Sequence, residues 1–319
     1  MIYGIIDIGS NTVRLNVYFY ENDNFDLIFS KKCKLGLEMY VKNGILTKKG
    51  LDNLEMAINN MKRDLMHLKI KKYSYFATAS LRNINNSNEI IKKIEKQTKI
   101  KIDLLSSEKE GKLGFVGFKK IFKREKGILV DIGGGSTEIT FFNGKTPQIL
   151  GSMPIGSLNL YHRYVSELIP NKQEHKTIKK RVFHEIKKLK IEENKEYLNY
   201  SVYEEKKHLY GIGGTFRNVE KLLLNLNIEK KGNAITPNSL KILEKELYYN
   251  DKKTFNKILK VNPSRIHTIV PGLLIIDVLS SYLDCCEIYV SKFGLREGYL
   301  EKFAEDGWNE GFELRIYSK

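Results

Sequence analysis

Two stretches of the sequence resemble each other: residues 5–15 read IIDIGSNTVRL and residues 129–139 read LVDIGGGSTEI. Each is an apolar run that ends in Asp-Ile-Gly and continues into a turn of small polar residues and a second strand-like segment. This pattern predicts a β-hairpin with a polar tip. The two aspartates, Asp7 and Asp131, are 124 residues apart. The repeat therefore predicts two copies of one domain.

The segments between and after the hairpins predict alternating helices and strands. Helical patterns occur at residues 47–68, 88–98, 108–122, 158–165, 173–189, 215–224, 237–247 and 270–282, and strand patterns at 72–78, 100–105 and 287–290. We expect a loop at 79–86 and an apolar turn at 208–210. Strands alternating with helices predict α/β domains with mixed sheets. We expect domains at 1–123 and 124–319, with a crossing near 119–127 and a last helix from about 297 that packs back on the first domain.

The composition indicates a folded, basic protein. The chain has 319 residues, 41% of them hydrophobic, and a net charge of +16. A disordered or collagen-like chain is excluded. Three cysteines, an odd number, and no signal-peptide pattern predict a cytoplasmic protein without a disulfide framework. No apolar run is long enough to span a membrane, and no zinc-ligand spacing occurs.

The excess of positive charge is compatible with nucleic acid, an anionic membrane surface or a polyanionic small substrate. The segment 171–190 carries eight basic residues against two glutamates. It either contributes to binding a polyanion or is a solvated helix face. Because no nucleic-acid-binding signature accompanies it, nucleic acid is not an expected partner.

Glycine-rich turns provide candidate phosphate sites. Residues 133–137 read GGGST, and three glycines allow successive backbone N–H groups to point into one concavity. A plain tight hairpin is the alternative. A third cluster, residues 211–217, reads GIGGTFR and precedes a helix, which is also a suitable anion site. Neither a dinucleotide-binding fingerprint nor a P-loop is present.

The aspartates before the loops would repel a bound phosphate unless a cation lies between the carboxylate and the phosphate. Mg²⁺ fits, because it takes one or two carboxylates together with water and phosphate oxygens. Asp7 and Asp131 are therefore candidate metal ligands, direct or through water. The alternative is that each Asp caps its own turn.

Eight collinear motifs resemble those of the exopolyphosphatase and guanosine pentaphosphate phosphohydrolase (Ppx/GppA) family, within the actin-like ATPase superfamily. The motifs are residues 7–15, 77–82, 106–113, 131–138, 152–156, 211–217, 263–272 and 294–298. The resemblance implies two ribonuclease-H-like domains that close by hinge movement on a central cleft. It also implies Mg²⁺, hydrolysis of a terminal phosphoanhydride and, from the family alone, a homodimer.

The resemblance also implies roles for individual residues. Glu110 matches the glutamate that activates the attacking water, and Glu138 matches a second glutamate that assists it or binds the metal beside Asp7 and Asp131. The implied phosphate-binding residues are Ser10, Asn11, Thr12, Arg14, Arg82, Gly133, Gly134, Gly135, Ser136, Thr137, Gly213, Gly214 and Thr215.

The sequence departs from the family pattern at two positions. Lys109 replaces a frequent Glu, which leaves a choice between Glu108 and Glu110 as the base. Asn159 stands where Arg is frequent, so one phosphate contact is expected to be missing. The phosphohydrolase extension of longer members is not matched, and we expect the short, two-domain form.

Three functions follow from these residues. The first is an exopolyphosphatase that hydrolyses inorganic polyphosphate with Mg²⁺ and a Glu-activated water. The second is a pppGpp 5′-phosphohydrolase that forms ppGpp. The third is a sensor that binds polyphosphate or alarmone without hydrolysis, although the retained Glu110 and Glu138 argue against it. The basic charge favours polyphosphate.

Overall fold

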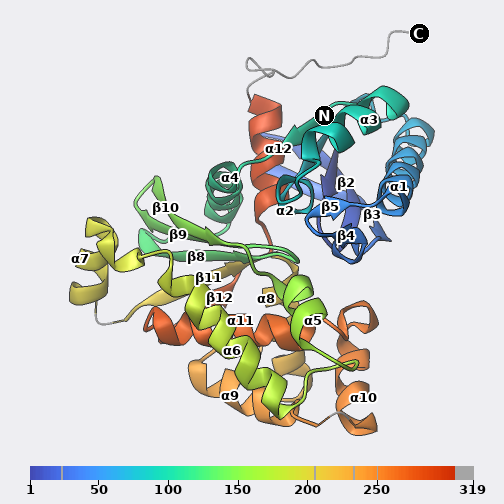
Figure 1. Cartoon of the computed structure of the whole chain (residues 1–319). Helices are drawn as coiled ribbons and strands as arrows, with labels where there is room; N and C mark the ends of the chain where they lie inside the picture. Colours follow the sequence, from blue (N-terminus) through green and yellow to red (C-terminus); the bar gives the residue numbers. More distant parts are fainter. Residues whose placement is uncertain (23, 205, 233, 250, 306–319) are drawn as a thin grey trace. The chain divides into compact units, whose positions relative to one another are not determined.

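A computed structural model describes residues 1–305 except 23, 205, 233 and 250, and they form two compact units (Figure 1). Of the described residues, unit 1 contains Met1–Glu110 and those from Arg296 to residue 305, and unit 2 contains Gly111–Leu295. The division falls inside helix α4 (Ser107–Lys119), earlier than the boundary after residue 123 that the sequence suggested. Helix α12 (Leu295–Glu305) contacts unit 1 through most of its length.

Unit 1 is built on a five-stranded mixed sheet with the order β3-β2-β1-β6-β7. Strand β2 is antiparallel to both of its neighbours, and the other pairs are parallel. This order and these directions are those of a ribonuclease-H-like sheet. The strands are β1 (Ile2–Ile8), β2 (Thr12–Glu21), β3 (Asn24–Lys34), β6 (Lys72–Ala77) and β7 (Ile102–Leu104), with a separate two-stranded ribbon of β4 (Val41–Lys42) and β5 (Ile45–Leu46).

Unit 2 repeats the same topology in its own sheet, with the order β10-β9-β8-β11-β12. Here β9 is the antiparallel strand between β8 and β10. The predicted fold class of two α/β domains with mixed sheets is confirmed. The strands are β8 (Lys126–Ile132), β9 (Thr137–Asn143), β10 (Thr146–Met153), β11 (His208–Ile212) and β12 (Glu287–Val290).

Helices cover both faces of the sheet in unit 1. Helices α1 (Lys48–His67) and α3 (Ser87–Thr98) bury their apolar stripes on the face that carries Ile6 and Ile8. The opposite face is covered by α12, where Tyr299 packs on Phe76. A short helix, α2 (Ala79–Arg82), follows β6.

The larger core of unit 2 lies between its sheet and a layer of helices. Helix α11 (Ile269–Tyr282) is central to it, because every residue from Ile269 to Ser280 is buried. The other face of this sheet is covered by α4, whose Phe115 and Phe118 pack against β8, β9 and β11. The remaining helices are α5 (Ser157–Tyr164), α6 (Lys172–Lys187), α7 (Lys195–Tyr203), α8 (Gly213–Asn225), α9 (Pro237–Glu246) and α10 (Lys252–Val261).

The two-residue period of the first strand in each unit decides where its aspartate points. In β8, Ile128, Val130 and Ile132 enter the main core, so Leu129 and Asp131 face the side covered by α4. In β1, Ile6 and Ile8 enter the core with α1, so Asp7 faces the side covered by α12. Each aspartate therefore lies near the end of its strand, on the face away from the main helical layer.

The predicted turn at 208–210 is wrong, because these residues begin strand β11. This strand lies between β8 and β12, and its apolar residues are buried on both faces, so it has no polar side that alternates with an apolar one. The sequence analysis also missed β3, β10, α7 and α10. None of the helices in the described ranges is long and apolar enough to cross a membrane.

Candidate functional site

The glycine loop of unit 2 is held by the first turn of α5. The Ser157 N–H donates to Gly133 O at 3.0 Å, and the N–H groups of Leu158 and Asn159 both donate to Gly134 O. The carbonyls of the loop are thus turned toward α5. Within the described part of the chain, the N–H groups of Gly134 and Gly135 have no hydrogen-bond partner. Such unpaired, adjacent N–H groups can receive an anion.

Asn159 fixes this loop with its side chain. Its Nδ2 donates to Gly135 O at 3.0 Å and to Pro154 O at 3.2 Å, while its Oδ1 accepts from the Gly156 N–H at 2.8 Å. Gly156 lies against the loop so closely that a Cβ would be 2.5–2.7 Å from backbone atoms of Gly133 and Gly134. The asparagine that replaces the expected Arg therefore stabilises the glycine loop.

Asp131 and Glu138 form a carboxylate pair beside the loop. They are directly opposite each other on the antiparallel strands β8 and β9, so their side chains share one face of the sheet. Glu138 is buried and accepts a hydrogen bond from Ser152 Oγ at 3.0 Å. The Asp131 carboxylate also lies next to Gly213, where a Cβ would be 2.5 Å from Oδ1. Two predicted metal ligands and the third glycine loop thus meet in unit 2.

The first turn of α8 adds backbone N–H groups on this side. Gly213 has φ 89°, a conformation that glycine adopts readily, and Thr215 Oγ1 donates to Ile132 O at 2.8 Å. A cation not predicted from the sequence lies here as well, because a Cβ on Gly214 would be 2.8 Å from Nη2 of Arg265. Arg265 belongs to the segment 263–272, which resembles a family motif, but the sequence predicts no role for its arginine.

The corresponding loop in unit 1 has the same closing bonds. Gly9 N–H donates to Thr12 O at 3.1 Å, as Gly133 N–H donates to Ser136 O at 2.9 Å. Ser80 Oγ donates to Ile8 O at 2.6 Å, matching the bond from Thr215 in unit 2. Both hairpin tips are thus tied to the following parallel strand and helix in the same way. Ser10 and Asn11 are buried, and Asn11 Oδ1 has no partner among the described residues.

Glu110, the predicted base, pairs with Arg82, a predicted phosphate ligand. Arg82 Nη1 donates to the Glu110 carboxylate and also, at 2.8 Å, to Leu105 O. Glu110 is buried, whereas Glu108 is exposed. The surroundings of Glu110 orient its carboxylate by an ion pair and by burial, whereas Glu108 is exposed.

Asp7 has two arginines as neighbours in unit 1. Arg296 Nη1 in α12 donates to Asp7 Oδ2 at 2.8 Å, and both side chains are more than four-fifths buried. Arg14 is directly opposite Asp7 on β2, at the position that Glu138 takes opposite Asp131 in unit 2. The structure therefore places Asp7 beside a guanidinium.

The remaining predicted phosphate ligands lie on the same loops. Ser136 and Thr137 are buried, and Thr137 Oγ1 donates to Ile155 O, so this hydroxyl stabilises the loop. Among the described residues, no group of three or more His, Cys, Asp or Glu side chains could hold a metal ion. Two carboxylates next to a phosphate loop are still a donor set that suits Mg²⁺, whose other ligands are water and phosphate oxygens.

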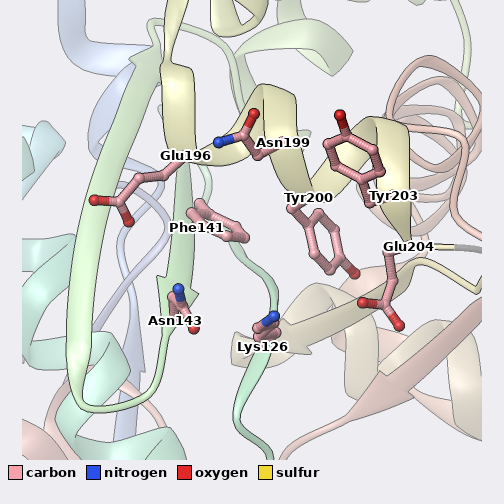
Figure 2. A pocket seen from close by; sticks show the side chains of 8 residues that line it. All are labelled: Lys126, Phe141, Asn143, Glu196, Asn199, Tyr200, Tyr203 and Glu204. Atoms are coloured by element: carbon pink, nitrogen blue, oxygen red, sulfur yellow. The ribbon is translucent and has the colours of Figure 1, made fainter.

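A pocket of about 210 Å³ in unit 2 lies apart from these loops (Figure 2). Its wall includes Lys126, the first residue of β8, and Asn143, the last residue of β9, together with Tyr200 and Tyr203 of α7. The glycine loop joins the other ends of the same two strands. This pocket is therefore not part of the candidate phosphate site.

The lysine-rich segment forms α6, and part of its charge is neutralised within unit 2. Lys179 bridges Glu244 and Asp277, while Arg181 and Lys188 both pair with Glu185. Its exposed lysines are Lys172, Lys176, Lys180, Lys187, Lys188 and Lys190. The segment is thus both a structural helix and a basic surface.

Comparison with known proteins defines the class that these loops belong to. The chain matches the sequence profile of the Ppx/GppA phosphatase family over residues 17–305. It belongs to this family. Two solved structures have the same fold. A Ppx/GppA family member from Aquifex aeolicus has a TM-score of 0.74 and 22% identity, over 98% of this chain and 99% of that one. An exopolyphosphatase from Cytophaga hutchinsonii has a TM-score of 0.78 and 21% identity, over 95% of this chain and 97% of that one.

Curated relatives carry phosphatase names. A bifunctional 3-dehydroquinate synthase/phosphatase from Fusobacterium nucleatum is 28% identical over 90% of this chain and 44% of that protein. Exopolyphosphatase 1 from Mycobacterium tuberculosis is 28% identical over 54% of this chain and 52% of that protein. The chain thus spans about half the length of these relatives.

Proposed function

We propose that this protein is an exopolyphosphatase that hydrolyses the terminal phosphoanhydride bond of inorganic polyphosphate. The observation that carries the proposal is the glycine loop of unit 2, where unpaired N–H groups lie beside Asp131 and Glu138. Phosphoryl transfer mainly requires positioning, neutralisation of charge and an oriented nucleophile. Family membership and the exopolyphosphatase name of relatives support the choice of reaction.

Glu110 is the proposed general base. Its ion pair with Arg82 holds the carboxylate in one orientation, and a carboxylate positioned in this way can take a proton from water. The backbone N–H groups of Gly134 and Gly135 bind a terminal phosphate group in this proposal. Arg265 adds positive charge beside Gly214.

Mg²⁺ is the proposed cofactor, with Asp131 and Glu138 as the residues that hold it. Bound there, the ion would neutralise phosphate oxygens next to two carboxylates that otherwise repel the substrate. Ser152, through its hydrogen bond, orients the Glu138 side chain for this role.

Polyphosphate is preferred to pppGpp because of the exposed lysines of α6, which suit a long chain of negative charges. The alternative enzymatic function is hydrolysis of pppGpp, another reaction of the family. The alternative non-enzymatic function is a sensor that binds polyphosphate or alarmone without hydrolysis. A homodimer and a cytoplasmic location stay proposals from the family resemblance and the sequence.

Phosphate release by the purified protein tests the proposal. The wild type, Glu110→Gln and the matched control Glu108→Gln are assayed with Mg²⁺ on polyphosphate and on pppGpp. We expect release from polyphosphate and a fall in kcat of about 10²–10⁴-fold for Glu110→Gln alone. Release of phosphate from pppGpp alone would make pppGpp the substrate in place of polyphosphate. No release from either compound would leave the non-catalytic sensor as the remaining hypothesis. Full activity in Glu110→Gln would remove Glu110 as the base.

A further inference from the structure

We propose that Arg296 is a positioning residue that takes the place of a metal ion at Asp7, so that only unit 2 holds the metal. This inference rests on the proposed function for its substrate. It concerns a difference between two loops that the repeated sequence makes look equivalent. Both follow an Asp-Ile-Gly sequence at the end of a strand, and both are closed by the same hydrogen bonds.

The first step is the direct contact of Asp7. The distance of 2.8 Å from Arg296 Nη1 to Asp7 Oδ2 is that of a charge-assisted hydrogen bond. The exposed fractions of the two side chains are 18% for Arg296 and 17% for Asp7. Because water screens this pair only partly, the guanidinium neutralises the carboxylate efficiently.

The second step is the position across the hairpin. Asp7 is opposite Arg14 in unit 1, whereas Asp131 is opposite Glu138 in unit 2. One aspartate thus has an arginine as its cross-strand neighbour, and the other has a second carboxylate. A divalent cation is attracted by paired carboxylates and repelled by guanidinium groups, so the cross-strand pairs of the two hairpins have opposite preferences.

The third step is the support of Arg296 itself. The next residue in α12, Glu297, accepts a hydrogen bond from Tyr18 at 2.7 Å, and Tyr18 in turn accepts from Asn16 Nδ2 at 2.7 Å. All three of these side chains are buried. The first turn of α12 is therefore fixed against β2, and Arg296 is held at Asp7 rather than free to reach solvent.

The consequence concerns the phosphate loop at Ser10, Asn11 and Thr12, which begins three residues after Asp7. A carboxylate without a partner would repel a polyanion there. With Arg296 in place, the loop can accept phosphate without a metal ion of its own.

Two binding measurements on the full chain test the proposal, and neither depends on turnover. The first is the affinity for Mn²⁺ alone, measured by electron paramagnetic resonance. We expect Asp7→Asn to change the Kd less than about twofold and Asp131→Asn to raise it at least about tenfold. Equal weakening by the two variants would make Asp7 a metal ligand and overturn the proposal.

The second measurement is calorimetric binding of tripolyphosphate without metal. We expect Arg296→Met to weaken it about tenfold, because the Asp7 carboxylate loses the guanidinium that donates to it. Arg296→Lys should recover most of the loss, and the double variant Asp7→Asn/Arg296→Met should bind at least about threefold more tightly than Arg296→Met. The exposed Arg63→Met on α1 is the matched control and should bind like the wild type.

A double variant that binds no better than Arg296→Met would also overturn the proposal, because the effect would then be a general loss of structure. A protein that binds both probes but releases no phosphate would refute the proposed activity and leave the role of Arg296 supported by these comparisons. If the wild type does not bind tripolyphosphate, the Mn²⁺ comparison alone decides the role of Asp7.

Discussion

The hydroxyl of Tyr18 donates a hydrogen bond of 2.7 Å to Glu297, a residue 279 positions later in the chain. A second bond of 2.9 Å joins the hydroxyls of Ser74 and Tyr299. Through these contacts the last described helix covers one face of the first sheet. Unit 1 is therefore complete only when the far end of the chain has folded onto it.

Tyr18→Phe tests the contribution of this contact to stability. The substitution leaves the buried Glu297 carboxylate without this donor and Asn16 without this acceptor, so we expect a loss of about 1–3 kcal/mol in the free energy of unfolding. Urea unfolding followed by circular dichroism measures the change. Tyr203→Phe, at a side chain that is 83% exposed, is the control and should have almost no effect.

The same variant should alter stability at alkaline pH. Burial, and then the charge of Glu297, raises the pKa of Tyr18 above its ordinary value of 10.0. A raised folded-state pKa means that the stability is present below pH 10 and is lost as the pH rises above it, because the unfolded state releases the proton first. The decline in stability between pH 9 and 11 should be smaller in Tyr18→Phe, and an unchanged decline would contradict this reasoning.

A buried charge cluster in unit 2 gives the opposite dependence at acidic pH. Burial alone would raise the pKa of Glu244, but hydrogen bonds from His175 and Lys179 outweigh it and hold the pKa below the ordinary value of 4.5. The stability from this carboxylate is therefore present above pH 4.5 and is lost as the pH falls through the lower folded-state value.

We expect Glu244→Gln to lower the free energy of unfolding by about 3 kcal/mol at pH 7, because Lys179 keeps only Asp277 as a partner. The difference from the wild type should shrink between pH 5.5 and pH 3.5. Glu193→Gln is the control, since its pair with Lys190 is exposed. A difference that does not depend on pH would show that the ionised form of Glu244 is not responsible.

Much of the fold could be predicted from the sequence because its signals are local. The apolar strand, the Asp-Ile-Gly turn and the periodic helices each lie within a short window. Strand β3 was missed because it is an edge strand whose side chains are mostly exposed, so it lacks the alternation of buried and exposed positions.

The candidate site could be predicted only in part, because only some of its residues belong to local sequence motifs. The glycine loops and their aspartates are visible as short motifs. The partners that distinguish one loop from the other, Arg265 and Arg296, come from distant parts of the chain, and Arg296 is 289 residues from Asp7. No local pattern states that one aspartate faces an arginine and the other a glutamate.

Asn159→Ala tests whether the shape of the unit 2 loop matters for phosphate. The substitution removes two side-chain bonds to carbonyls and one from the Gly156 N–H, so the loop loses its brace. We expect weaker phosphate binding, seen as a rise of about tenfold in KM, and a loss of about 1–3 kcal/mol in stability. Asn199→Ala, at an exposed position of α7, is the control. A KM equal to that of the wild type would mean that the loop keeps its shape without Asn159.

The exposed lysines of α6 provide a test of chain-length preference. Lys172, Lys176 and Lys180 recur every four residues and so lie along one stripe of the helix. If this stripe binds polyphosphate, the triple substitution to Gln should raise KM about fivefold for long chains and leave tripolyphosphate unchanged, and the effect should fade as salt screens the charges. The triple change of Lys71, Lys92 and Lys96, all exposed in unit 1, removes the same charge elsewhere. An equal rise in KM for the two triple variants would show that the effect comes from the overall net charge of +16. It would also show that α6 does not bind the substrate.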